Sequence, residues 1–264
     1  MATLVSFHAH PDDETISTGG TLAKASDAGH RVVVVFATRG EHGEVEEGFL
    51  APGEDLWRRR VEESREAARI LGTARVEFLG YVDSGMMGTA ENDAPDAFWG
   101  ADVDEAAERL AAILTEEGAE VLTVYDDHGT YGHPDHIQVH RVGVRAGELA
   151  GTPRVYEATS NRDHMRRMMV AAREAGMDVA DRFSDEEVEA FGSPESDITT
   201  VVDVSDYLDR KRAAMAAHAS QISEQSFFLA MPPEPFAMAF GTEWFIRRGA
   251  SPGAQEADLF TGLD

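Results

Sequence analysis

Residues 31–37 read RVVVVFA, a nearly continuous run of β-branched residues. A strand with one face in water alternates apolar and polar side chains, whereas an unbroken run is typical of a strand buried on both faces. Strands of that kind occur in parallel sheets, where helices cover both faces. The run therefore predicts a central strand of a parallel sheet.

Strands and helices alternate on either side of this run. The pattern predicts strands at 3–7 (TLVSF), 76–79 and 121–125, and helices at 15–28, 57–71 and 103–117. Helices that alternate with short strands indicate βαβ units with right-handed crossovers. We therefore expect an α/β protein with a Rossmann-like, three-layer α/β/α fold and a mostly parallel sheet.

The second half of the chain is less regular. It predicts a helix from Pro134 to about Ala150, a strand at 154–157, a helix at 162–175, a strand at 198–204 and a helix at 207–219. The acidic stretch 178–197 has few apolar residues and is expected to be a surface excursion. We expect residues 1–248 to form a single domain and residues 249–264 (SPGAQEADLFTGLD and the residue pair before it) to be a flexible C-terminal tail.

Composition excludes several classes of partner. The chain has 49 Asp and Glu against 23 Lys and Arg, a formal net charge of −26. Binding to duplex nucleic acid or to an anionic membrane requires a basic surface, so neither is expected. There is no cysteine, which leaves His, Asp and Glu as metal ligands. No signal peptide or membrane span is visible, and we expect a cytoplasmic protein whose oligomeric state is left open.

Two segments that follow predicted strands carry the reactive residue types. HAHPDDE (8–14) follows the first strand, and DDHGTYGHPDH (126–136) follows the strand that ends at residue 125. Each segment taken alone is compatible with an ordinary helix start, because Pro and Asp favour that position. Ligands of parallel sheets bind at the carboxyl ends of the strands, so together the two segments indicate a site. Gly19 and Gly20 do not form the glycine-rich turn of a dinucleotide site.

The two segments contain the residues that a catalytic zinc site requires. Such a site has three protein ligands and keeps one position for water, and the best set here is His10, Asp13 and His136. Fe²⁺ or Co²⁺ would accept the same ligands. Asp12 is then free to act as the general base. His140, four residues after His136, is an alternative ligand on the same helix face.

The second segment also offers groups for the developing oxyanion. His133 and Tyr131 are expected to donate hydrogen bonds to it. Asp135 is expected to orient His133, as a carboxylate often does beside a histidine.

Five motifs together resemble the LmbE/PIG-L family of zinc-dependent N-deacetylases, and among them the mycothiol-pathway deacetylase and conjugate amidase. They are AHPDDE at 9–14, GEHGE at 40–44, DSGMMGT at 83–89, YGHPDH at 131–136 and HASQ at 218–221. The resemblance covers roughly residues 1–248. It implies the same ligands and general base, with hydrolysis of the acetyl group from an amino-sugar conjugate that contains N-acetylglucosamine.

The resemblance further implies that Glu44, Arg60 and Asp83 contact the sugar hydroxyls, with Arg58 or Arg59 as alternatives to Arg60. It leaves open an amidase that cleaves mycothiol-type or antibiotic conjugates with the same centre. A non-catalytic, metal-dependent sugar-binding module is a further alternative, but such a module has no evident use for Asp12.

Overall fold

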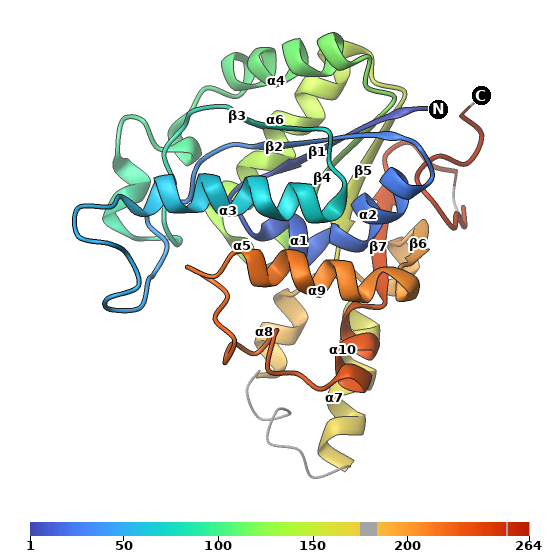
Figure 1. Ribbon diagram of the computed structural model, residues 1–264. Helices are drawn as coiled ribbons and strands as arrows, with labels where there is room; N and C mark the ends of the chain where they lie inside the picture. Colours follow the sequence, from blue (N-terminus) through green and yellow to red (C-terminus); the bar gives the residue numbers. More distant parts are fainter. Residues whose placement is uncertain (175–183, 252, 264) are drawn as a thin grey trace.

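The computed structural model describes residues 1–174, 184–251 and 253–263, and its centre is one mixed sheet (Figure 1). The strands lie in the order β3-β2-β1-β4-β5-β7-β6. Their bounds are β1 Thr3–His8, β2 Arg31–Phe36, β3 Arg75–Phe78, β4 Val121–Tyr125, β5 Arg154–Thr159, β6 Thr200–Asp203 and β7 Thr242–Arg247. The first five strands of that order are parallel, and β7 runs antiparallel between β5 and β6. The predicted mostly parallel sheet is confirmed, but β7 was not predicted.

Helices cover both faces of the sheet. Their bounds are α1 Asp13–Ser17, α2 Gly19–Asp27, α3 Leu56–Leu71, α4 Val103–Glu117, α5 Gly129–Gly132, α6 Pro134–Ala150, α7 Arg162–Glu174, α8 Asp185–Ala190, α9 Leu208–Ala217 and α10 Pro233–Phe240. α4 and α6 pack on one face, and α2, α3 and α9 pack on the other (Figure 1). The predicted three-layer α/β/α arrangement is therefore confirmed.

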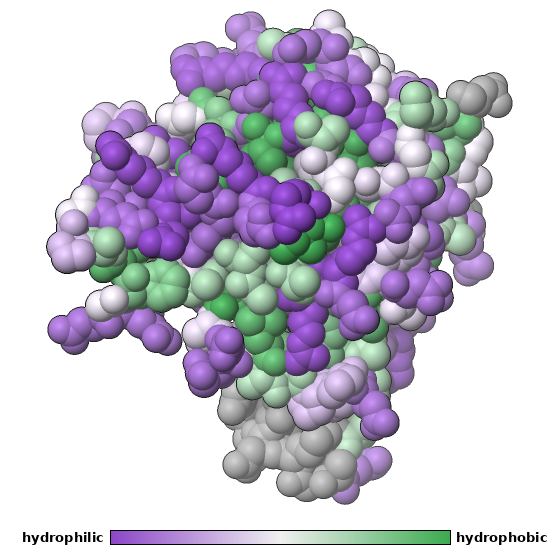
Figure 2. All heavy atoms as spheres, in the orientation of Figure 1, coloured by the Kyte–Doolittle hydropathy of each residue, from purple (hydrophilic) through white to green (hydrophobic). Residues whose placement is uncertain are grey.

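The central strands are buried on both faces, as the run at 31–37 predicts. In β1, Val5 and Phe7 join the core under α4 and α6, whereas Leu4 joins the core under α2 and α3. The outer surface of α3 is hydrophilic in Figure 2, in keeping with its many Arg and Glu residues. α3 thus presents most of its charged side chains to solvent.

The helix predicted at 15–28 is broken at Thr18 into α1 and α2. Directly after the break, Gly20 lies against the end of β6, where a Cβ atom would be 2.5 Å from Val204 Cβ. Any side chain larger than hydrogen would overlap with Val204. Gly20 therefore permits close packing of α2 against the end of β6.

The C-terminal segment, predicted as a flexible tail, makes specific contacts with the folded chain. Leu259 is buried in the core under α2 and α3. The Phe260 ring stacks on His30 with 3.7 Å between ring centroids, and the Glu256 carboxylate accepts hydrogen bonds from Tyr156 and Thr200. Composition did not reveal the aliphatic anchor Leu259 or the aromatic anchor Phe260. The flexibility of residues 249–264 stays a prediction.

Two further expectations concern the surface. Residues 178–183 of the acidic stretch, and residue 175 of the predicted helix, lie outside the described residues. Within 184–197 the chain forms α8 and a short 3₁₀ turn, with Val188 buried. Among the described residues, no helix has the length and hydropathy to cross a membrane.

Candidate active site

The two segments singled out in the sequence meet at the carboxyl ends of β1 and β4. β1 ends at His8 and α1 begins at Asp13, while β4 ends at Tyr125 and α6 begins at Pro134. β1 and β4 are neighbouring parallel strands, so their following loops lie side by side. His10, Asp135 and His136 are all buried there.

The predicted metal ligands converge on one carboxylate oxygen. Asp13 Oδ2 lies 3.2 Å from His10 Nδ1 and 3.3 Å from His136 Nε2. The other ring nitrogen of His10, Nε2, lies 3.1 Å from Asp135 Oδ2 and 3.4 Å from Asp83 Oδ1. His10 is therefore surrounded by three carboxylates.

The donor set fits a divalent cation. His136 Nδ1 and Asp135 Oδ1 are buried without a hydrogen-bond partner among the described residues, and His136 Nε2 has its 3.3 Å contact with Asp13 Oδ2 but no hydrogen bond of good geometry. An unpartnered buried polar atom costs free energy, and a bound cation would remove that cost. Two groups of three have ligand atoms within 4.8 Å of one another, namely His10, His133 and His136, and His10, Asp83 and Asp135. Asp13 belongs to neither group but contacts both His10 and His136.

Asp12 directly precedes Asp13, and its carboxylate contacts a buried arginine. Its Oδ2 is 3.3 Å from Arg60 Nη2. Burial raises the pKa of the Asp12 carboxyl to about 6, although the Arg60 charge opposes the shift. A carboxyl with a pKa near neutrality is well matched to accepting and returning a proton.

His133 caps α6 and presents its other nitrogen to the cluster. Its Nδ1 accepts the backbone N–H of Asp135 at 3.1 Å, so the neutral ring carries its proton on Nε2. Burial, followed by the charges of His10 and His136, lowers the pKa of His133 to about 4. A neutral ring with an N–H donor is what an oxyanion requires. Tyr131 is half exposed, with its ring 6.2 Å from that of His133.

The carboxylate of Asp135 lies elsewhere than predicted. It contacts His10 Nε2 and accepts the backbone N–H of Ser84 at 2.9 Å. The hydrogen bond that joins Asp135 to His133 comes from its backbone N–H. The expected orientation of His133 by this carboxylate is therefore not what the structure shows, because the helix start turns the side chain toward His10.

The three residues that the family resemblance assigned to substrate lie at different depths. Asp83 is buried against His10 and accepts the N–H groups of Gly85 and His42. Arg60 is buried and donates to the carbonyls of Pro11 and Gly40. Glu44 is exposed, and its carbonyl accepts Gln221 Nε2–H at 3.1 Å.

The alternatives to Arg60 point away from the cluster. Arg58 is exposed and pairs with Asp55, and Arg59 is half-buried and pairs with Glu54. Of the three arginines, only Arg60 contacts Asp12.

The alternative ligand His140 faces another part of the chain. Its Nδ1 lies 3.0 Å from the carbonyl oxygen of Tyr125, which this nitrogen can reach only as a donor. It is a member of neither three-residue ligand group. His140 thus bonds to a backbone carbonyl and is not grouped with His136 as a candidate ligand.

A buried polar network that the sequence did not reveal lies beneath the cluster. His8 Nδ1 lies 2.9 Å from the Tyr125 hydroxyl, and Ser6 Oγ lies 2.7 Å from His8 Nε2. The Tyr125 ring stacks on His136 with 4.3 Å between centroids. The signal in the sequence was Ser6 and His8 in an otherwise apolar strand, but their partners on β4, Thr123 and Tyr125, lie 117 residues away.

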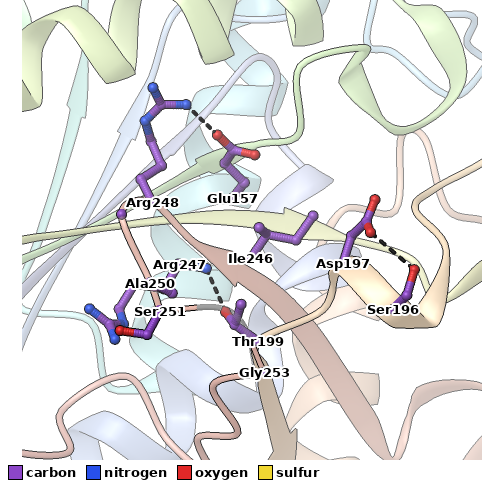
Figure 3. A pocket seen from close by; sticks show the side chains of 11 residues that line it. Glu157, Ser196, Asp197, Thr199, Ile246, Arg247, Arg248, Ala250, Ser251 and Gly253 are labelled. Atoms are coloured by element: carbon purple, nitrogen blue, oxygen red, sulfur yellow. Dashed lines mark hydrogen bonds and ion pairs between the residues drawn. The ribbon is translucent and has the colours of Figure 1, made fainter.

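A pocket of about 420 Å³ lies away from these residues (Figure 3). It is bordered by the ion pair of Glu157 and Arg248, 2.7 Å apart, and by Thr199, which accepts the N–H of Arg247. None of its lining residues belongs to the histidine and aspartate cluster. It lacks histidine and therefore the chemistry that the cluster offers.

Comparison with known proteins shows that the chain is similar over nearly its whole length to deacetylases, which are hydrolases of linear amides. A 1D-myo-inositol 2-acetamido-2-deoxy-alpha-D-glucopyranoside deacetylase from Acidothermus cellulolyticus is 42% identical to this chain. The alignment covers 100% of this chain and 96% of that protein. Its counterpart from Thermomonospora curvata is 40% identical, over 97% of this chain and 95% of its own. The model of the PIG-L family, described as GlcNAc-PI de-N-acetylase, matches residues 5–147. The chain belongs to the PIG-L family, which confirms the resemblance seen in the motifs.

Solved structures agree on the fold. The N,N'-diacetylchitobiose deacetylase from Pyrococcus horikoshii is 25% identical with a TM-score of 0.58, over 95% of this chain and 84% of that one. A deacetylase of the teicoplanin biosynthesis pathway has a TM-score of 0.63 over 95% of this chain and 100% of that one, at 18% identity. The likeness to the second protein concerns the fold alone.

Proposed function

We propose that this deacetylase uses zinc and acts on a conjugate that contains N-acetylglucosamine, first of all the N-acetylglucosaminide of myo-inositol. The proposal is carried by the convergence of His10, Asp13 and His136 next to the raised-pKa carboxyl of Asp12. The names of relatives at 40% and 42% identity support the substrate. A neutral sugar also carries no charge that a protein of net charge −26 would repel.

His10, Asp13 and His136 would hold the zinc, and Fe²⁺ or Co²⁺ would fit the same set. When bound, the metal supplies Lewis acidity toward the amide carbonyl and lowers the pKa of the attacking water. Asp83 and Glu44 would accept hydrogen bonds from sugar hydroxyls, and Arg60 would act through Asp12, which it contacts.

The side chains of the chain itself account for the proton movements. Asp12 accepts a proton as the water oxygen bonds to the carbonyl carbon. His133 Nε2–H and the Tyr131 hydroxyl donate hydrogen bonds to the oxygen that gains negative charge. Asp12 then donates its proton to the nitrogen as the C–N bond breaks, which leaves acetate and a free amine.

Other activities have less support. An amidase for larger conjugates is not favoured by relatives that are named deacetylases. A sugar-binding module without turnover would leave the Asp12 arrangement without a use. The cytoplasmic location stays a prediction of the sequence.

The test compares Asp12→Ala with Asp127→Ala, which removes an exposed aspartate from the neighbouring loop. Zinc content is measured by mass spectrometry, and amine release is measured with N-acetylglucosaminyl-inositol, a mycothiol conjugate and N,N'-diacetylchitobiose. We expect Asp12→Ala to keep its zinc and to lose about 10²–10⁴-fold in kcat, with Asp127→Ala unchanged. Retained turnover in Asp12→Ala would contradict the mechanism, and a preference for another substrate would contradict the proposed specificity.

A further inference from the structure

Asp12 has a backbone conformation that L-residues rarely adopt. Its φ is 97° and its ψ is −35°. Among the described residues other than glycine, only Asp12 and Thr130 have positive φ. Such a conformation costs free energy and persists only where neighbouring groups hold it. Two buried charged side chains do so here.

Glu14 holds the backbone of Asp12 from one side. Its Oε2 accepts the backbone N–H of Asp12 at 2.9 Å, and its Oε1 accepts a hydrogen bond from His218 Nε2 at 2.7 Å. Both side chains are almost completely buried. His218 directly follows α9, so the pair connects the loop after β1 with a segment 204 residues later.

Arg60 holds the same loop from α3. Its Nη2 donates to the carbonyl of Pro11 at 2.5 Å and lies 3.3 Å from Asp12 Oδ2. The N–H, the carboxylate and the preceding carbonyl of Asp12 are thus each held by a charged buried side chain. Glu14 is absent from both three-residue ligand groups.

We propose that Glu14 and His218 are a positioning pair that holds Asp12 in its left-handed backbone conformation and so keeps its carboxylate aimed for proton transfer. The inference rests on the proposed function of Asp12 as general base. Replacing a buried charged pair by apolar residues of similar volume is often neutral or stabilising, so stability alone does not require this pair. Its specific effect is on the direction of a catalytic group, where small displacements are costly.

The chain offers a matched control in Glu63, whose partner Ser220 lies two residues after His218. Glu63 is also buried, and its carboxylate accepts the N–H and the hydroxyl of Ser220 at 2.9 and 2.6 Å. This pair ties the same turn to α3, but no hydrogen bond joins it to Asp12 among the described residues. Glu63→Ala therefore removes a comparable buried carboxylate without releasing the Asp12 backbone.

The experiment compares Glu14→Ala, Glu14→Gln and Glu63→Ala in the zinc-loaded full chain. We expect Glu14→Ala to lower kcat about 10–100-fold, with KM within about twofold and zinc content unchanged. Glu14→Gln keeps an acceptor for the Asp12 N–H and should recover most of kcat. Glu63→Ala should lower the melting temperature but keep kcat within about twofold. In amide exchange followed by NMR, the Asp12 N–H should lose protection only in Glu14→Ala.

A second comparison tests whether the two residues act as one unit. His218→Gln keeps a donor for Glu14 and should be milder than His218→Ala, and the double variant Glu14→Ala/His218→Ala should be no slower than Glu14→Ala alone. Equal losses of kcat in Glu14→Ala and Glu63→Ala, or an Asp12 amide that stays protected, would overturn the positioning role. That result would leave the proposed function intact as long as Asp12→Ala is inactive, whereas an active Asp12→Ala would refute the proposed function itself.

Discussion

Close packing between α6 and β4 supports the site, and Gly143→Ala tests it. A Cβ at residue 143 would lie 2.2 Å from Val124 Cγ1, more than 1 Å short of the ordinary contact range. Overpacking of this kind costs about 1–3 kcal/mol, and the overlap with a fully buried strand residue places the cost near the upper end. The gain in helix propensity from Gly to Ala offsets about 1 kcal/mol. We expect a net loss of about 2 kcal/mol in the free energy of unfolding.

Val124→Ala provides the internal check. It removes the atom that collides and leaves the Cβ of residue 124 at 3.4 Å from the new methyl group. Val124→Ala alone should cost about 2 kcal/mol through the cavity that it leaves, and in the double variant the methyl group added at position 143 partly fills that cavity. We therefore expect the double variant to be about 2 kcal/mol more stable than the sum of the single changes predicts.

The assay is urea unfolding of the four proteins, with zinc affinity as a second measurement because α6 carries His136. Gly147→Ala, one turn later, is a milder control, since its Cβ would lie 2.9 Å from Val155 Cγ2. Additive free energies in the double-mutant cycle would refute the reasoning, because they would mean that α6 and β4 are not in contact at Gly143.

Two further predictions concern stability. Hydrogen bonds from Arg31 and Arg75 lower the pKa of Glu117 from 4.5 to about 2, so its stabilising effect is present above pH 4.5 and is lost as the pH falls toward 2. Glu117→Gln should lower the free energy of unfolding by about 1 kcal/mol at pH 7, a value reduced because Arg31 is half exposed. Urea unfolding at several pH values should show this difference vanishing near pH 2. A difference that does not change with pH would contradict the assignment. Leu259→Ala should cost about 2–4 kcal/mol because the side chain is fully buried, and calorimetry would show no change in melting temperature if the C-terminal segment were loosely held.

Local patterns predicted the five parallel strands because short β-prone segments alternate there with helix signals, although β3 (RVEF) and β5 (RVYEAT) each contain an Arg and a Glu. They did not predict β7, where Glu243 interrupts the sequence TEWFIR. That carboxylate is buried because Lys211 contacts it at 2.6 Å and because the N–H groups of Gly20 and Thr21 donate to it. Its partners lie in other parts of the sequence, so no local pattern could reveal that a charged residue belongs to a buried strand.

In the site, too, the sequence predicted which residues take part but not all of the contacts between them. Spacing and motif resemblance selected His10, Asp13 and His136, and the structure brings these three together. Neither source indicated that Asp83 and Asp135 also contact His10, nor that Tyr125 stacks on His136. These contacts arise from the side-by-side position of β1 and β4 and from the turn at the start of α6, which are properties of the assembled sheet.

The crowding of carboxylates around His10 would favour a divalent cation at this place. Asp13, Asp83 and Asp135 all lie within 3.4 Å of His10. Burial alone would lower the pKa of the His10 ring, but these carboxylates hold it well above its ordinary value. A divalent cation would compete with that proton, since a metal ligand must be unprotonated. The same carboxylates that favour the proton also favour the cation, and Arg60 balances the remaining charge of Asp12.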